Sequence, residues 1–166
     1  MNPVKTLFIM RHAQTEWADA GIEDAHRHLT EQGRAQAQAI AQQFQAKQAT
    51  LDVIYTSPAI RTLTTAQIIA TQFEIAKQHI VIDPQIYAAQ VHNLLAVLAE
   101  IEEIHQTMLI VGHNPSVSDL VGYLCNQPRI QLSPATLVGL QIESPSWLET
   151  SHGIHYATQQ LFLQPN

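Results

Sequence analysis

The chain has 166 residues, 46% of them hydrophobic and 13% charged, which suits one globular domain with a sizeable core. Eight Lys and Arg against 14 Asp and Glu give a formal net charge of −6, which argues against non-specific binding to nucleic acid. The single cysteine excludes an intramolecular disulfide and makes a cysteine-based zinc site unexpected.

The sequence also bears on location. The first ten residues lack the basic region and apolar core of a signal peptide. No apolar run approaches the roughly 20 residues needed to span a membrane. We therefore expect a cytoplasmic protein with no membrane or nucleic-acid partner, and we expect Cys125 on a buried helix face.

The chain begins with a predicted strand, a loop and a helix. Residues 5–10 form a short, continuously apolar run, typical of a strand buried on both faces. The polar stretch 14–28 lacks a clear period and predicts a long loop. Thr30 is a suitable cap for the helix that follows. The expected core positions of this helix are Ala35, Ala39, Ile40 and Phe44.

The middle of the chain repeats the strand–helix alternation. Residues 51–56 predict a second strand. Ser57 is a suitable cap, and Pro58 suits the first position of a helix that runs to about Phe73. Residues 79–82 predict a third short strand.

Another helix–strand–helix unit follows. Residues 91–104 place Leu94, Leu95, Leu98 and Ile101 on one helical face. Residues 108–111 predict a fourth buried strand. Asn114 is positioned to cap a helix that begins at Pro115 and runs to about Cys125.

The C-terminal part predicts a different arrangement. Residues 136–143 and 153–162 resemble two strands with no helix between them, and we expect an antiparallel pair at a sheet edge. Strands that alternate with helices imply a mostly parallel sheet covered on both faces. The predicted fold is a three-layer α/β/α sandwich in a single domain over residues 1–166.

Histidine and arginine residues that could act in catalysis lie at or just after the ends of three predicted strands. Ligands bind at the carboxyl ends of the strands in a parallel α/β sheet. The first strand ends in Arg11 and His12, and the fourth ends just before His113. Arg61 lies one turn into the helix after the second strand. We predict that these four residues converge at one rim of the sheet as the catalytic residues.

Such a cluster suits phosphoryl transfer. Neutral imidazole is a nucleophile near pH 7 and can form a covalent phosphoramidate at His12. The planar forks of Arg11 and Arg61 match the equatorial oxygens of a phosphoryl group. His113 would add a hydrogen bond as charge builds up in the transition state. Because the arginines neutralise the charge, no metal is needed.

The motifs around these residues resemble those of a known family. LFIMRHA at residues 7–13 resembles the Arg-His-Gly signature of the histidine phosphatase superfamily, whose fold is phosphoglycerate mutase-like. SPAIRTLTTA at residues 57–66 resembles its second-arginine motif, and VGHN at 111–114 resembles its second-histidine motif. All three stand in the family's order, and the similarity extends through the C-terminal strand pair.

The resemblance carries implications for fold and site. It implies a sandwich with a largely parallel sheet, with no metal and no organic cofactor. It makes His12 the phosphorylated nucleophile. The phosphate pocket would then consist of Arg11, Arg61 and His113.

The loop after His12 points to one branch of the family. DAHRHLT at residues 24–30 resembles the Asp-x-x-Arg-Pro-Leu-Thr of short SixA-type phosphohistidine phosphatases. Ala13 replaces the signature glycine, and Ala18 replaces an asparagine that is common in mutases. Arg27 would then bind the substrate's phosphate, although a solvated loop arginine is an equally good interpretation.

The predicted substrate is phosphohistidine on a phosphotransfer protein. Mutases supply an acidic glutamate between the second arginine and the second histidine, but no carboxylate lies between Asp83 and Glu100 here. A phosphoramidate with a protonated ring nitrogen needs less acid assistance than an alkyl ester. Two alternatives stay open: a small-molecule phosphomonoesterase for a metabolite or nucleotide, and a phosphate-binding module without turnover.

Two aromatic residues near these motifs have ambiguous roles. Trp17 would either flank the mouth of the site or hold the loop by packing, and we favour packing. Tyr87 would line the pocket, or belong to the core or the rim.

Overall fold

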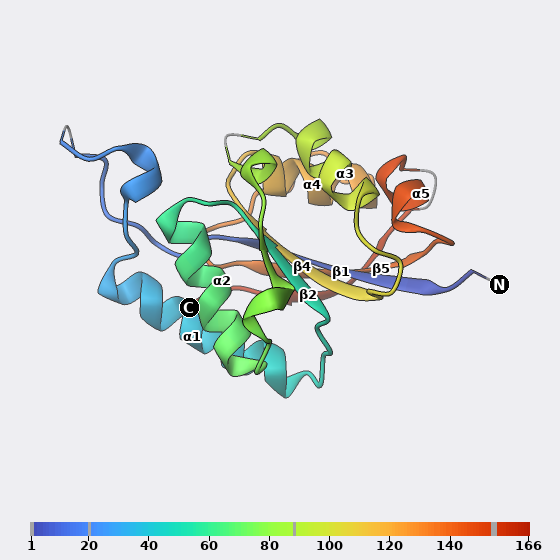
Figure 1. The fold of residues 1–166 in the computed structure, drawn as a ribbon, viewed down its shortest axis with the longest axis horizontal. Helices are drawn as coiled ribbons and strands as arrows, with labels where there is room; N and C mark the ends of the chain where they lie inside the picture. Colours follow the sequence, from blue (N-terminus) through green and yellow to red (C-terminus); the bar gives the residue numbers. More distant parts are fainter. Residues whose placement is uncertain (1, 20, 88, 154–155) are drawn as a thin grey trace.

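The computed structural model describes residues 2–19, 21–87, 89–153 and 156–166. The described residues form a mixed six-stranded sheet in the order β3-β2-β4-β1-β5-β6 (Figure 1). The strands are β1 Val4–Arg11, β2 Val53–Thr56, β3 Ile80–Ile82, β4 Thr107–Gly112, β5 Leu137–Glu143 and β6 Thr158–Leu163. β1, β2, β3 and β4 pair in parallel, whereas β5 pairs antiparallel with both β1 and β6. The predicted parallel sheet with an antiparallel edge is confirmed.

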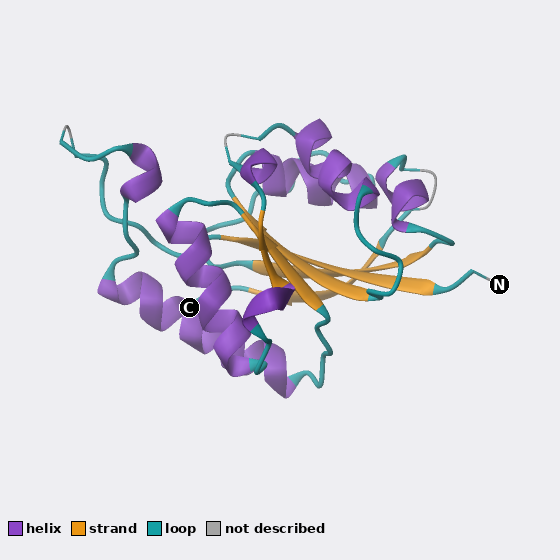
Figure 2. Ribbon diagram, viewed as in Figure 1, coloured by secondary structure: helices purple, strands orange, loops and turns teal. Residues whose placement is uncertain are grey.

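Helices cover both faces of this sheet (Figure 2). The α-helices are α1 Glu31–Ala46, α2 Ile60–Gln72, α3 Val91–Ala99, α4 Ser116–Cys125 and α5 Trp147–Ser151. Short 3₁₀ helices are η1 Asp24–His26, η2 Lys77–His79 and η3 Pro84–Ile86. α1 and α2 lie on one face, and α3, α4 and α5 lie on the other (Figure 1). The three-layer sandwich is therefore confirmed.

Each face of the sheet has its own apolar core. Alternate residues of β1 serve the two cores, because successive side chains in a strand point to opposite faces. Leu7 and Ile9 lie in the core shared with α3 and α4, whereas Phe8 and Met10 lie in the core shared with α1 and α2. Phe44 of α1 packs edge-on against Phe8, with ring centroids 4.6 Å apart. Burial on both faces fixes the strands whose ends carry the site.

The core face of α1 differs from the predicted one. The buried residues recur at i, i+3, i+4 and i+7 from Ala37, and they include Ile40 and Phe44. Ala35 and Ala39 are exposed, because they fall on the opposite side of this helix. The expected cap is confirmed, since Thr30 Oγ1 accepts a hydrogen bond of 2.9 Å from the Gly33 N–H.

The starts and ends of three helices also differ from the predictions. α2 begins at Ile60 and not at Pro58, because the Ser57 Oγ accepts from the Ala59 N–H (3.1 Å) in a turn that precedes the helix. α3 ends at Ala99, five residues before the predicted end at 104. α4 begins at Ser116, one residue after the predicted start.

Asn114 does not cap α4 in the predicted way. Its Nδ2 donates to the Leu132 carbonyl oxygen (2.8 Å), and its Oδ1 accepts from the Ser118 hydroxyl (2.6 Å). The side chain therefore ties α4 to the segment before β5. Cys125, the last residue of α4, is half-buried, and burial raises the pKa of its thiol.

The C-terminal segment contains a helix that was not predicted. α5 lies between β5 and β6, where the sequence pattern predicts no helix. The Ser146 Oγ caps it by accepting from the Glu149 N–H (3.1 Å), and Trp147 anchors it as a fully buried side chain. β6 begins at Thr158, later than the predicted start at 153, and residues 154–155 of that prediction lie outside the described residues.

Within the described ranges, no helix is both long enough and apolar enough to cross a bilayer.

Candidate active site

The carboxyl ends of β1, β4 and β2 meet at one edge of the sheet. The parallel register sets Arg11 beside Gly112 and Thr56 beside Val111. The residues that follow these strands are therefore neighbours in space. The His12 N–H donates to the Gly112 carbonyl oxygen at 3.1 Å, which extends the ladder by one step. This arrangement brings the predicted strand ends together.

His12 is held as a neutral imidazole with one free nitrogen. Its Nδ1 lies 2.8 Å from the Ala13 carbonyl oxygen, which can only accept, so Nδ1 carries the proton and Nε2 keeps its lone pair. Burial, together with the charges of Arg61, Arg11 and Arg27, lowers the pKa of His12 to about 4. The ring is therefore unprotonated at neutral pH and its Nε2 is available as a nucleophile.

His113 lies beside His12, with 5.3 Å between the ring centroids. Its Nε2 is 2.9 Å from the Ser57 Oγ, so the end of β2 orients this second ring. Burial and then the charge of Arg61 lower the pKa of His113 to about 3. His113 is neutral, and it can contribute a hydrogen bond to a bound anion but not a positive charge.

The positive charge at the site comes from arginines. Arg61 is 5% exposed, and its Nη1 and Nη2 donate to the main-chain oxygen and Oδ2 of Asp24 at 2.7 and 2.9 Å. Arg11 donates from Nη1 to the Leu132 carbonyl oxygen at 3.1 Å. The Nε atoms of both arginines are buried without a hydrogen-bond partner. Because leaving a buried donor unpaired is costly, these N–H groups indicate a place for an oxyanion.

Arg27 lies at the same pocket. Its Nη1 donates to the Glu16 carbonyl oxygen at 3.4 Å, and its Nε is 3.2 Å from the Asp24 Oδ1. Its charge contributes to the lowered pKa of His12. The side chain is only 20% exposed. Arg27 is therefore held beside the pocket by Asp24 and the Glu16 carbonyl oxygen, and phosphate binding by this residue stays a prediction.

The pocket that contains His12 is small and opens beside the loop after β1. It has a volume of about 280 Å³. Its lining residues are Arg11, His12, Gln14, Thr15, Glu16, Trp17, Arg27 and Pro134. Trp17 is 94% exposed at this mouth, so the prediction that it packs against the loop is wrong. The loop is instead held by its main chain, through a bridge between Thr15 and Leu29.

Two residues without an assigned role complete the site. The Asp24 Oδ2 accepts from the Tyr87 hydroxyl at 2.7 Å as well as from Arg61. The Tyr87 hydrogen bond, followed by Arg61 and Arg27, lowers the pKa of Asp24 to about 2. The Tyr87 ring also lies 5.6 Å from the His113 ring, centroid to centroid. In the sequence, Asp24 is marked only by its place three residues before Arg27 in the Asp-x-x-Arg pattern.

Thr65 positions the backbone of the nucleophile. Its Oγ1 accepts from the Ala13 N–H at 3.1 Å and donates to the Arg61 carbonyl oxygen at 2.7 Å. One hydroxyl of α2 thus connects the His12–Ala13 turn to the helix that carries Arg61. Sequence reasoning missed this contact, because a threonine inside a helical motif has no distinguishing pattern.

Across the described part of the chain, no group of three or more His, Cys, Asp or Glu side chains is arranged to hold a metal ion.

The sequence pattern of the Histidine phosphatase superfamily (branch 1) matches residues 7–87, which include His12, Arg27 and Arg61. The match confirms the predicted resemblance to this superfamily. A 2,3-bisphosphoglycerate-dependent phosphoglycerate mutase from Brucella anthropi is 39% identical to this chain over 70 residues. That match covers 41% of the chain and spans 34% of the mutase's own length.

Solved structures of SixA proteins are similar over nearly the whole chain. A candidate phosphohistidine phosphatase SixA from Nakamurella multipartitia has a TM-score of 0.82 at 25% identity, with 98% of this chain and 97% of that chain covered. A second candidate SixA, from Agrobacterium tumefaciens, has a TM-score of 0.79 at 25% identity, with coverage of 98% and 99%. A mycobacterial glucosyl-3-phosphoglycerate phosphatase shares the fold, with a TM-score of 0.68 at 16% identity and coverage of 96% and 98%.

Proposed function

We propose that this protein hydrolyses phosphohistidine on a phosphotransfer protein through a covalent intermediate on His12. The observation that carries the proposal is the state of the His12 ring. The Ala13 carbonyl oxygen fixes the proton on Nδ1, so Nε2 presents a lone pair beside three arginines. The nucleophile shares its small pocket with Arg11 and Arg27, and the charge of Arg61 also acts on its ring.

In the first step, the His12 Nε2 attacks the phosphorus and the bond from phosphorus to the substrate's nitrogen breaks. The unpaired Nε donors of Arg11 and Arg61 are available to the equatorial oxygens of the phosphoryl group. His12 then carries the phosphoryl group on Nε2 while Nδ1–H keeps its hydrogen bond to the Ala13 oxygen. The protein needs no proton transfer to or from His12 in this step.

In the second step, water attacks the phosphorus and the bond from phosphorus to Nε2 breaks. The water's proton leaves with phosphate or solvent, and His12 returns to its neutral form. Phosphate then dissociates from Arg11, Arg27 and Arg61. The same donors serve both steps, because the phosphoryl group keeps its equatorial oxygens throughout.

Three observations support a protein-bound phosphohistidine as the substrate. The pocket opens at the exposed side chain of Trp17, which leaves room for a side chain that projects from a protein surface. The Asp24 carboxylate is ionised and therefore supplies no proton to a poor leaving group. The SixA proteins of similar structure are described as candidate phosphohistidine phosphatases.

The mutase relative supports a second candidate, a phosphomonoesterase for a small metabolite. To separate the two, we would compare phosphate release by wild type and His12→Ala. The substrates would be a phosphohistidine-bearing phosphotransfer protein and a panel of small phosphomonoesters. We expect fast, His12-dependent release from the protein substrate.

The other outcomes have definite meanings. Release from a small ester alone would retain the mechanism and replace the substrate. Absence of His12-dependent release from every substrate, with phosphate binding retained in His12→Ala, would indicate a binding module and overturn the proposal.

A further inference from the structure

An ionised carboxylate contacts two arginines of the site, Arg27 and Arg61. Asp24 is 52% exposed at its side chain, whereas His12 is 7% exposed. The connection between them runs through ring contacts from His12 to His113 and from His113 to Tyr87, whose hydroxyl donates to Asp24. Asp24 therefore stands at the solvent end of a series of contacts that begins at the nucleophile.

The leaving group must also lie on the solvent side. In-line displacement places the leaving atom opposite the attacking atom, and the attacking His12 is buried at the end of β1. A phosphoryl group held by Arg61 is also close to Asp24, because both terminal nitrogens of Arg61 contact that residue. The carboxylate is thus within reach of a group attached to the phosphorus.

Resting on the proposed function, we propose that Asp24 accepts a hydrogen bond from the protonated second ring nitrogen of the substrate's phosphohistidine. Asp24 is then a specificity-determining residue that favours P–N bonds over P–O bonds. The charged and titratable groups that face it are Arg61 of α2, Arg27 after η1, and Tyr87 and His113.

The proton and electron count of the first step follows from this arrangement. The substrate enters as a phosphoimidazolium, with one nitrogen bonded to phosphorus and an N–H directed at Asp24. The His12 Nε2 lone pair forms the new P–N bond, and the substrate's nitrogen leaves with the electron pair of the old bond. The departing imidazole is neutral because it keeps its N–H. His12 becomes the phosphoimidazolium, with its N–H directed at the Ala13 oxygen.

Ester substrates gain nothing from the same carboxylate. An alkyl or aryl phosphate releases an oxygen that develops negative charge, and Asp24 repels that charge. A protonated imidazole is attracted instead, since an opposite charge nearby favours the charged form of a titratable group. The same residue therefore acts in opposite directions on the two classes of substrate.

The test compares Asp24→Asn with wild type on two substrates. Asn has the same shape and keeps one acceptor oxygen, so the substitution removes the charge and turns the second acceptor into a donor. The substrates are a phosphohistidine-bearing phosphotransfer protein and p-nitrophenyl phosphate, and kcat/KM is measured for each across pH 5 to 9 (roughly the range in which a histidine titrates). Asp19→Asn is the matched control, a neutralised carboxylate in the same loop whose main-chain oxygen accepts from Ile22.

We expect Asp24→Asn to lower the ratio of the phosphohistidine rate to the ester rate by about 10-fold or more, since an opposite charge shifts a pKa by about 1 unit or more. The ester rate itself rises. The alkaline limb of the phosphohistidine profile moves to lower pH by about 1 unit, and Asp19→Asn leaves the ratio unchanged.

Equal loss on both substrates with an unmoved pH profile would overturn the inference, because it would show that Asp24 only positions Arg61. An unchanged ratio with full activity on both would overturn it too. A wild type that releases phosphate only from the ester would instead contradict the proposed substrate, which distinguishes the two failures.

Discussion

At the scale of single residues, the site depends on buried donors that lack acceptors. Arg61 is the most deeply buried of its arginines, and its Nε has no hydrogen-bond partner. Arg61→Ala removes this donor together with the charge. We expect the rate of phosphate release to fall by at least about 100-fold, as for the loss of one transition-state donor. Single-turnover kinetics with the phosphorylated protein would measure it.

Arg61→Lys is the informative companion variant. Lysine keeps the charge but lacks the planar fork, so we expect only partial recovery of the rate. A near wild-type rate in Arg61→Ala would show that Arg61 is not a catalytic residue.

The two site histidines also make stability depend on pH. Burial holds the pKa values of His12 and His113 at about 4 and about 3 in the folded protein, below the ordinary histidine value of 6.5. As the pH falls below 6.5, the unfolded chain binds protons that the folded chain does not. The free energy of unfolding therefore decreases, by up to about 1.4 kcal/mol per pH unit for each histidine.

Urea denaturation at several pH values between about 4.5 and 7.5 would measure this slope. The double variant His12→Gln, His113→Gln should show a shallower dependence, because it lacks both groups. Asp24 does not contribute within this range, since its stabilisation is lost only as the pH falls toward its lowered pKa of about 2. Equal slopes in the two proteins would contradict the prediction.

At the scale of elements, the loop after β1 is attached to the first turn of α1. The Thr30 N–H donates to the Gln14 carbonyl oxygen at 3.0 Å, and Gly33 lies against the same oxygen. A Cβ at position 33 would overlap that carbonyl group. Glycine is therefore required by close approach between helix and loop, and not by an unusual backbone angle.

Gly33→Ala should both destabilise the fold and impair the site. We expect a loss of about 1–3 kcal/mol, typical of overpacking, and a lower kcat/KM because the loop carries Arg27. Gly21→Ala is the control, since no atom lies within 4 Å of a Cβ built there. Thermal unfolding and phosphate release would measure the two effects. Wild-type stability in Gly33→Ala would show that the loop shifts freely.

Prediction from the sequence succeeded where a pattern reflects one dominant force. Continuous apolar runs identified β1 and β4, because strands buried on both faces admit few polar side chains. The core face of α1 was mispredicted, since an alanine-rich helix offers little contrast between faces. α5 is only five residues long and depends on the burial of Trp147, a tertiary contact that leaves no periodic signal.

The active site likewise contains residues that the sequence predicted and a contact that it did not predict. Arg11, His12 and His113 stand next to strand ends and Arg61 lies in the first turn of α2, so the order of strands and helices was enough to predict that they meet. Asp24 and Tyr87 are 63 residues apart and meet through a hydrogen bond between two irregular segments. No spacing rule predicts such a contact.

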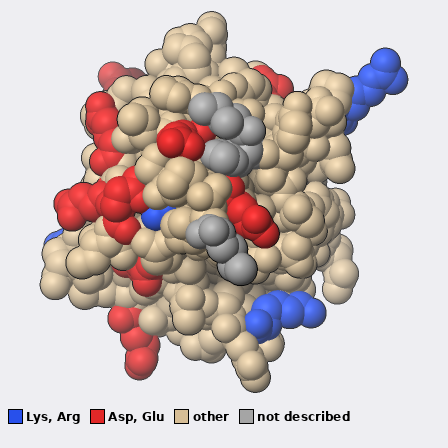
Figure 3. Space-filling model, turned by 90° about the vertical axis from the view of Figure 1, so that its right-hand side faces the viewer, with Lys and Arg blue, Asp and Glu red and all other residues tan. Residues whose placement is uncertain are grey.

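At the scale of the whole molecule, the sheet separates two polar clusters. The site lies at the carboxyl end of β1, whereas Lys5, Glu103 and Trp147 meet near its amino end. The Lys5 Nζ contacts the Glu103 Oε2 at 2.6 Å and lies 5.5 Å from the centroid of the Trp147 ring. His12 follows Lys5 by seven positions, roughly 23 Å along an extended strand at about 3.3 Å per residue. On the face that carries the N-terminus, acidic side chains cover more of the surface than basic ones (Figure 3).

Glu103→Gln should therefore change stability without changing catalysis. Lys5 is 2% exposed at its side chain and loses the carboxylate that compensates its charge. Because Glu103 is itself 50% exposed, solvent screens the pair, and we expect a loss of only about 1 kcal/mol. The melting temperature should fall by about 2–4 °C.

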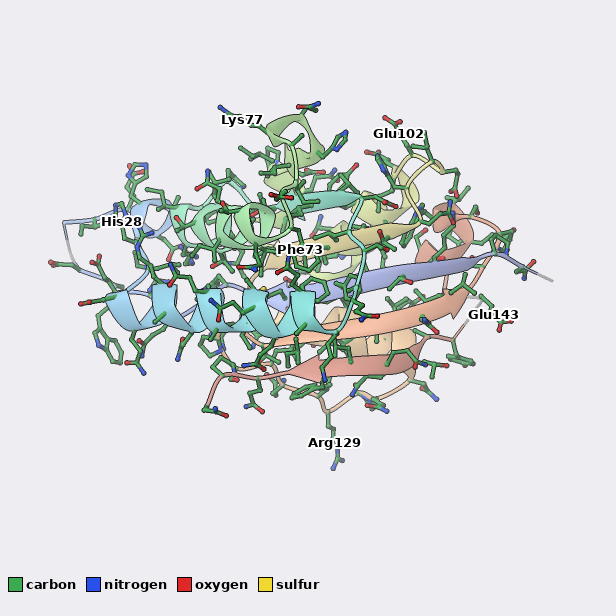
Figure 4. The ribbon with its side chains drawn as sticks, turned by 90° about the horizontal axis from the view of Figure 1, so that it is seen from below. His28, Phe73, Lys77, Glu102, Arg129 and Glu143 are labelled. Atoms are coloured by element: carbon green, nitrogen blue, oxygen red, sulfur yellow. The ribbon has the colours of Figure 1, made fainter. Side chains whose placement is uncertain are left out.

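The neighbouring Glu102 supplies the matched control, since its side chain is exposed at the surface (Figure 4). Glu102→Gln removes the same charge from the same segment, and we expect no change in melting temperature. Both variants should retain the wild-type kcat/KM, because the cluster lies at the far end of β1 from His12. A lowered kcat/KM in Glu103→Gln alone would mean that the two ends of the sheet are coupled. Equal melting temperatures in the wild type and both variants would mean that the Lys5–Glu103 pair contributes nothing to stability.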